Sequence, residues 1–138
     1  MKKILFGLLI LASSLFAEVT NVDVTPQFIQ ENNLKVIDVR TRGEWEATGI
    51  VPNAYLLTFF DERGNYDIEG FLSKLNKIVD RDETFALICR TGSRTGMISN
   101  FLGEKLNYHV VNLRGGMMKL LREGFQPAPY NPANIVTQ

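Results

Sequence analysis

The sequence predicts an α/β domain with a central, mainly parallel sheet of five strands and helices on both faces of the sheet. Short apolar runs alternate along the chain with longer segments in which apolar residues recur at helical spacing. Such alternation is typical of parallel sheets. The 138 residues are 45% hydrophobic and 22% charged, which are ordinary values for one packed globular domain.

Five short runs bounded by polar or turn-forming residues are the expected strands. They are 18–23, 36–39, 54–57, 85–88 and 110–113. The first of these is expected to be a short edge strand or an arm. Helices are expected at 25–32, opened by Thr25, at 41–49, opened by a capping box of Thr41 and Glu44, and at 68–79, 94–106 and 117–124. The proline-rich residues 127–132 are expected to form a surface tail.

The N-terminus has the pattern of a secretory signal peptide. Two lysines precede an apolar run at 4–11, and small and apolar residues continue to Ala17; these are the charged, apolar and cleavage regions of such a leader. We expect residues 1–17 to be removed, which leaves an exported, periplasmic domain at 18–138 without a stable membrane span. A retained anchor is the alternative, but the run is short for a span, which needs about 20 apolar residues.

Charge and residue content argue against two classes of function. The formal net charge is zero and no basic patch stands out, so nucleic acid is not an expected partner. His109 is the only histidine and Cys89 the only cysteine, so a histidine–cysteine metal site is not expected. We expect neither a metal nor a cofactor.

Cys89 is the candidate nucleophile. It directly follows the expected strand 85–88 and precedes a helix, and in parallel α/β sheets functional sites lie at the carboxyl ends of strands. A single cysteine cannot form an internal disulfide, and an odd cysteine in an exported protein indicates a reactive thiol or an intermolecular bridge. A buried structural cysteine is the alternative.

The loop after Cys89 favours the reactive thiol. Gly92 allows the backbone to curl tightly, and the following helix offers unpaired N–H groups and a positive dipole end. Arg90 and Arg94 add positive charge. Each feature favours the thiolate, which is the nucleophilic form, and the same loop would bind an anion next to the sulfur.

Four stretches of the chain resemble, in order, the motifs of single-domain rhodaneses. They are 36–40 at the opening strand, 44–45 together with 49–54, the cysteine loop 89–94 with glycine three and arginine five residues after the cysteine, and the double-glycine turn at 113–116. Together they place a motif-bearing core at about 25–124. One such motif would be weakly specific, whereas four in this order and spacing are strongly specific.

The resemblance implies a rhodanese-like fold and sulfurtransferase activity. A sulfane sulfur from a small anionic donor, thiosulfate or polysulfide, would be held as a persulfide on Cys89 and passed to a nucleophilic acceptor, such as cyanide or a small-molecule or protein thiol. The residues implied to bind the substrate are Arg90, Thr91, Gly92, Ser93 and Arg94. Ile50 and Met117 depart from the family pattern, which puts the choice of donor or partner in doubt more than the chemistry.

Three charged residues near the first motif are expected to be structural. Asp38, Arg40 and Glu44 lie at the end of a buried strand and the start of a helix, where paired charges commonly hold loops in place. We expect hydrogen bonds and an ion pair between Asp38 and Arg40, with Glu44 as a further partner.

The sequence is also compatible with three other functions. A cysteine phosphatase or arsenate reductase would have arginine six residues after the cysteine, but here that position is Thr95 and the arginine is Arg94. A non-enzymatic carrier could bind sulfane sulfur or polysulfide and deliver it to a membrane enzyme. A pure interaction module is the third possibility, although inactive modules of this kind typically lack the cysteine.

Overall fold

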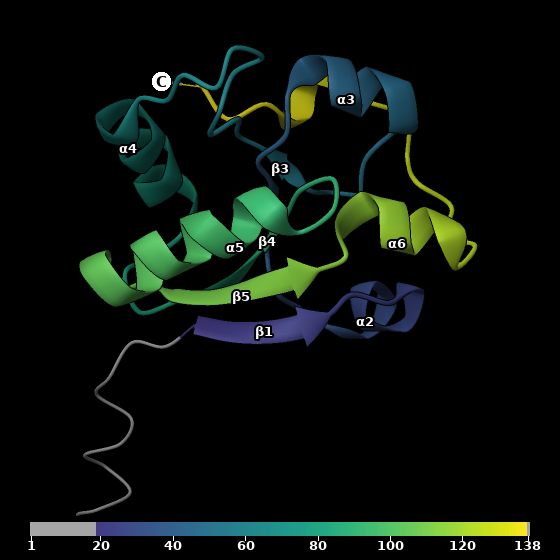
Figure 1. Cartoon of the computed structure of the whole chain (residues 1–138), viewed down its shortest axis with the longest axis horizontal. Coiled ribbons are helices and arrows are strands. Elements are labelled where there is room, and N and C mark those ends of the chain that lie inside the picture. Colours follow the sequence, from purple (N-terminus) through teal and green to yellow (C-terminus); the bar gives the residue numbers. More distant parts are fainter. Residues whose placement is uncertain (1–18, 138) are drawn as a thin grey trace, which may run out of the picture.

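The computed structural model describes residues 19–137, which form a five-stranded sheet with helices around it (Figure 1). In chain order the elements are β1 (Val19–Asp23), α2 (Pro26–Glu31), β2 (Val36–Asp38), α3 (Arg42–Thr48), β3 (Tyr55–Leu56), α4 (Ile68–Ile78), β4 (Thr84–Ile88), α5 (Ser93–Asn100), the π-helical turn η1 (Phe101–Lys105), β5 (His109–Arg114), α6 (Gly116–Arg122) and the 3₁₀ turn η2 (Pro132–Asn134). The strand order is β1-β5-β4-β2-β3, and all four pairings are parallel. The predicted fold class is therefore confirmed.

Side chains of the strands alternate between two hydrophobic cores, one on each face of the sheet. On one face Ala86 and Ile88 of β4 pack with Trp45 of α3 and Leu120 of α6. On the other face Leu87 and Cys89 belong to a second core, whose helical members are Phe71 and Leu75 of α4, Ile98 of α5 and Leu102 of η1. Helices thus cover both faces, and Cys89 is part of the core beneath α4 and α5.

The proline-rich C-terminal segment is not a surface tail, so this prediction is wrong. Ile50 and Ala128 exchange two backbone hydrogen bonds of 2.8 Å, and the N–H of Val136 donates to the carbonyl of Leu56 in β3. The ring of Tyr130 stacks on Trp45 at 6.0 Å between centroids. The physical reason is that β3 is an edge strand, and the segment pairs with polar groups that would otherwise remain free there.

The expected signal peptide, residues 1–17, lies outside the described residues. Within 19–137, none of the helices combines the length and the apolar character that crossing a membrane requires. The first described residues form β1, which pairs along its whole length with β5. Residues 19–23 of the expected segment 18–23 therefore form an edge strand and not a free arm.

Candidate active site

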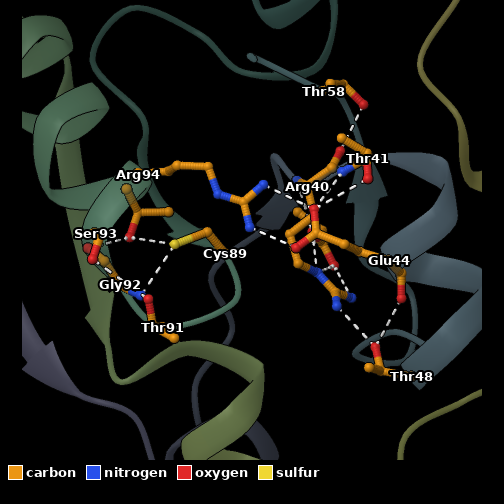
Figure 2. Close-up of polar contacts among 12 residues, drawn as sticks. Arg40, Thr41, Glu44, Thr48, Thr58, Cys89, Thr91, Gly92, Ser93 and Arg94 are labelled. Atoms are coloured by element: carbon orange, nitrogen blue, oxygen red, sulfur yellow. Dashed lines mark hydrogen bonds and ion pairs between the residues drawn. The ribbon is translucent and has the colours of Figure 1, made fainter. Parts of the chain in front are cut away.

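Cys89 lies at the carboxyl end of β4, which is the middle strand of the sheet. Its side chain is only 1% exposed. At Gly92 the backbone turns into the left-handed region, with φ of 99°. This turn brings the N–H of Gly92 back onto the sulfur, so that it donates a hydrogen bond of 3.1 Å to Sγ (Figure 2). A side chain at Gly92 would also meet the backbone nitrogen of Gly115 at 3.0 Å, so glycine fits both the turn and the close approach.

The loop around the sulfur holds several free hydrogen-bond donors. Within residues 19–137, no acceptor is found for the backbone N–H groups of Arg90, Thr91, Ser93, Arg94 and Thr95. The last three belong to the first turn of α5, where N–H groups have no partner within the helix. Free N–H groups at a helix start favour negative charge, so the loop can hold an anionic group beside Sγ.

Arg94 does not extend freely into this loop. Its guanidinium forms two hydrogen bonds with the carboxylate of Glu44, of 2.6 and 2.8 Å, across fifty residues of sequence (Figure 2). The same carboxylate accepts hydrogen bonds from the N–H and the hydroxyl of Thr41. These hydrogen bonds, foremost that of Arg94, lower the pKa of Glu44 to about 2. The carboxylate hydrogen bond is also the main cause that raises the pKa of Arg94. The positive charge of Arg94 is therefore balanced within the protein.

Arg90 differs from Arg94 in this respect. It is exposed and forms no ion pair with any residue in the described part of the chain. Of the two arginines predicted to bind substrate, Arg90 is the one whose charge remains available to an incoming anion. Thr91 and Ser93 are exposed as well, and their hydroxyl oxygens lie 3.4 Å apart.

Asp38 and Arg40 form a fully buried ion pair beside the site. The guanidinium of Arg40 contacts both carboxylate oxygens of Asp38, with Nη2 2.8 Å from Oδ2. It also donates to the hydroxyl of Thr48 and to the carbonyl of Gly49. These bonds connect the end of β2 to the end of α3. The third expected member, Glu44, pairs with Arg94 and not with Arg40.

The double-glycine turn at Gly115 and Gly116 holds the cysteine loop through backbone hydrogen bonds. The N–H groups of Met117 and Met118 donate to the carbonyls of Cys89 and Arg90, at 2.9 and 3.0 Å. Gly116 has φ of 60°, and a Cβ there would lie 2.5 Å from both carbonyl oxygens. The motif pattern of the sequence does not by itself place this turn at the site. The predicted parallel sheet could have placed the turn there, because β4 and β5 are adjacent parallel strands and therefore end at the same edge of the sheet.

Thr95 is a site residue that the sequence analysis missed. It is 0% exposed, and its hydroxyl oxygen lies 3.5 Å from Sγ of Cys89 and 3.2 Å from the carbonyl oxygen of Gly92. A signal was present, since a hydroxyl in the first turn of the helix after the cysteine can face back towards the strand end. The two departures from the family pattern, Ile50 and Met117, are 1% and 0% exposed and belong to the core.

Comparison with known proteins decides the family. A family model described as a rhodanese-like domain matches residues 22–123. The chain belongs to the rhodanese-like domain family. The match covers all the elements that build the site, from β2 to α6.

Individual relatives of this rhodanese-like domain are distant. The "Putative sulfurtransferase YtwF" of Bacillus subtilis (strain 168) is 27% identical over 101 residues, which are 73% of this chain and 86% of that protein. Protein RP600 of Rickettsia prowazekii (strain Madrid E) is 35% identical over 79 residues, 55% of this chain and 63% of that protein. The crystal structure of a rhodanese-like domain protein from Staphylococcus aureus superposes with a TM-score of 0.56 at 24% identity, covering 78% of this chain and 97% of that one, which shows the shared fold.

Replacing Glu44 by glutamine is expected to reduce the acid sensitivity of this rhodanese-like domain. The pKa of Glu44 is lowered from 4.5 to about 2, mainly by the hydrogen bond from Arg94. A carboxylate with a lowered folded pKa stabilises the fold above its unfolded pKa, and this contribution is lost as pH falls from about 4.5 to about 2. Urea unfolding at neutral pH and near pH 3 should therefore show a smaller acid-induced loss in Glu44→Gln than in the wild type.

A matched control is Glu46→Gln, which removes the more exposed carboxylate that pairs with Arg42 on the same helix. Exposed pairs of this kind contribute little to stability, so this variant should keep the acid sensitivity of the wild type. If the Glu44→Gln variant and the wild type lost the same free energy of unfolding on acidification, the Glu44–Arg94 pair would not stabilise the fold.

Proposed function

We propose that this rhodanese-like domain is a sulfurtransferase that moves a sulfane sulfur from a small donor, thiosulfate or polysulfide, through a persulfide on Cys89. The acceptor is a nucleophile such as cyanide or a thiol. The observation that carries the proposal is the position of Sγ at the base of a loop whose N–H groups are free to hold an anion. The name of the related protein, "Putative sulfurtransferase YtwF", agrees with this activity.

The chemistry needs no oxidant or cofactor. The thiolate of Cys89 attacks the outer sulfur of thiosulfate, the S–S bond of the donor breaks, and sulfite leaves with the electron pair. The new persulfide carries its negative charge on the outer sulfur, where the free N–H groups of the loop stabilise it. Cyanide then attacks the outer sulfur, thiocyanate forms, and the electron pair of the broken S–S bond returns to Sγ as the thiolate.

Burial of the sulfur favours small donors. With 1% of Cys89 exposed, a bulky disulfide would have to displace the loop before its sulfur could reach Sγ. A small anion needs only the space beside the free N–H groups and meets the unpaired charge of Arg90. We therefore propose inorganic sulfur anions as donors, in preference to protein disulfides.

The phosphatase alternative loses support from the same geometry. A phosphate cradle needs a free arginine at the end of the loop to clamp the oxygens of the phosphate. Here Arg94 is engaged by Glu44, and the next residue is Thr95, whose hydroxyl lies near the sulfur.

The test of the proposed function is the steady-state kinetics of thiocyanate formation from thiosulfate and cyanide. A covalent intermediate predicts ping-pong behaviour, with parallel lines in double-reciprocal plots at several fixed cyanide concentrations. Intersecting lines would mean that both substrates bind before any sulfur moves, which contradicts a persulfide intermediate.

Replacing Arg90 by alanine is expected to weaken the use of thiosulfate. The loss of one charge-assisted hydrogen bond costs about 1.5–3 kcal/mol, or roughly 10- to 150-fold in kcat/KM. The effect should be smaller for a neutral organic trisulfide, because this donor brings no negative charge. Arg63→Ala, which removes an exposed arginine from the turn at 61–65, should leave both donors unaffected. Equal losses for the two donors in Arg90→Ala would contradict an electrostatic role.

We also propose that the protein acts after export, with Glu18 as its first residue. The proposal rests on the leader pattern at 1–17, and N-terminal sequencing of the protein purified from its native host tests it. A sequence that begins at Met1 would contradict processing.

A further inference from the structure

We propose that Thr95 is a catalytic residue that stabilises negative charge on Sγ of Cys89. Its hydroxyl donates to Sγ when the sulfur is a thiolate, and to the carbonyl of Gly92 when the sulfur is neutral. This inference rests on the proposed function, in which charge leaves Sγ and returns to it once in every cycle.

The contact geometry places one hydroxyl between two acceptors. Oγ1 of Thr95 lies 3.5 Å from Sγ and 3.2 Å from the carbonyl oxygen of Gly92. A hydroxyl has one hydrogen, so it donates to one of these atoms at a time. Rotation about the Cβ–Oγ1 bond is enough to change the acceptor, because the β-branched side chain itself is held in place within the helix. No backbone movement is required.

The carbonyl of Gly92 does not depend on this hydroxyl. The N–H of Gly96 already donates to it at 3.0 Å, as expected in the first turn of the helix. If the hydroxyl turns towards the sulfur, the carbonyl therefore keeps a hydrogen bond, and no buried polar group is left without a partner. The alternative, that Thr95 only caps the loop, does not explain why a second donor is needed at this carbonyl.

The burial of Cys89 and Thr95 makes the hydroxyl an important hydrogen-bond donor for the sulfur. Thr95 is 0% exposed and Cys89 is 1% exposed, so water has little access to Sγ. The N–H of Gly92 is the one backbone donor to Sγ within residues 19–137. A buried thiolate with a single direct hydrogen-bond donor would be costly, and the hydroxyl of Thr95 supplies a second donor.

The two sulfurs of the persulfide would then have separate sets of donors. The outer sulfur carries the charge in the persulfide and is held by free N–H groups of the loop. When the acceptor attacks the outer sulfur, the S–S bond breaks and its electron pair returns to Sγ. As this bond breaks, the hydroxyl of Thr95 turns from the Gly92 carbonyl to Sγ. Its hydrogen bond stabilises the negative charge that develops on Sγ and so lowers the barrier for cleavage of the S–S bond.

The test compares Thr95→Val with Thr95→Ser in two assays. Valine keeps the branched shape without the hydroxyl, and serine keeps the hydroxyl without the methyl group. The first assay is the single-turnover rate at which cyanide discharges the loaded protein. The second is the pH dependence of alkylation of Cys89 by iodoacetamide in the unloaded protein, which reports thiolate formation without any sulfur transfer.

For Thr95→Val we expect discharge to slow by roughly 10- to 150-fold, the range for a hydrogen bond to a charged group. The midpoint of the alkylation profile should rise by about one to two pH units. Thr95→Ser should restore both values to within about threefold and a few tenths of a pH unit, because serine keeps the donor. Ser99→Ala is the matched control: its hydroxyl is buried one turn along α5 and has no partner within residues 19–137, so both readouts should stay at the wild-type value.

Three outcomes would overturn the inference. Thr95→Val could keep the wild-type discharge rate and alkylation midpoint, which would leave Thr95 as a packing residue. Thr95→Ser could lose as much activity as Thr95→Val while folded, which would assign the effect to the methyl group. If Thr95→Val does not fold, an alkylation midpoint of Thr95→Ser that is raised by about one unit or more would contradict the role of the hydroxyl. Failure of the proposed function can be distinguished from failure of this inference. In that case the wild type would form no thiocyanate, while the alkylation assay would still report on the role of Thr95.

Discussion

Replacing Cys89 by serine is expected to abolish thiocyanate formation from thiosulfate. Serine can neither act as a thiolate nor hold a sulfur atom as a persulfide, and the chain has no second cysteine that could take over. Removal of the nucleophile from enzymes with covalent intermediates costs roughly 10⁶-fold, so the remaining rate should not rise above the background of the assay. The measurement is the steady-state assay with both substrates at saturation.

The fold should survive this change, which makes the result interpretable. The replacement exchanges one atom, and the hydrogen bond from Gly92 and the contact with Thr95 can both be made to an oxygen. The urea midpoint of Cys89→Ser should therefore stay close to that of the wild type. A folded Cys89→Ser protein that still formed thiocyanate at a measurable rate would show that the sulfur is carried elsewhere.

Replacing Gly116 by alanine is expected to lower the free energy of unfolding more than any other substitution proposed here, and to displace the cysteine loop at the same time. The new Cβ would lie 2.5 Å from the carbonyl oxygens of Cys89 and Arg90, a distance at which the backbone must move. The positive φ costs about 1–2 kcal/mol for a residue with a side chain, and crowding adds about 1–3 kcal/mol. Displacement of the cysteine loop should reduce kcat/KM by up to about 100-fold, because catalytic groups tolerate little misplacement.

The matched control is Gly124→Ala, which separates crowding from backbone strain. Gly124 also has a positive φ, of 85°, but a Cβ there would meet no atom within 4 Å. This variant should lose only the stability that the backbone conformation costs and keep the wild-type kcat/KM. If Gly116→Ala were as stable and as active as Gly124→Ala, the double-glycine turn would not support the cysteine loop.

The sheet and the position of the nucleophile could be predicted from the sequence because they depend on local patterns. Strands buried on both faces appear as short apolar runs, and β2, β4 and β5 lie within a residue or two of the predicted runs. Cys89 directly follows such a run, so its place at the carboxyl end of a strand needs no tertiary information. The glycine at position 92 indicated the tight turn for the same reason.

The partners of the loop could not be predicted, since they come from distant parts of the chain. The Glu44–Arg94 pair joins residues fifty positions apart, and its geometry depends on how α3 and α5 lie around the sheet. The sequence gives Arg90 and Arg94 equal weight as loop cations, whereas the structure pairs only Arg94. The C-terminal segment packs on the edge strand β3, although its many prolines are equally compatible with a loose tail.

The most direct test of a sulfur carrier at Cys89 is the intact mass of the protein after brief exposure to thiosulfate and removal of the excess. We expect that the wild type gains the mass of one sulfur atom, that cyanide removes this mass and releases one thiocyanate per protein, and that Cys89→Ser gains nothing. Thiocyanate formation by a wild-type protein whose mass never changes during turnover, or the same added sulfur on Cys89→Ser, would contradict it.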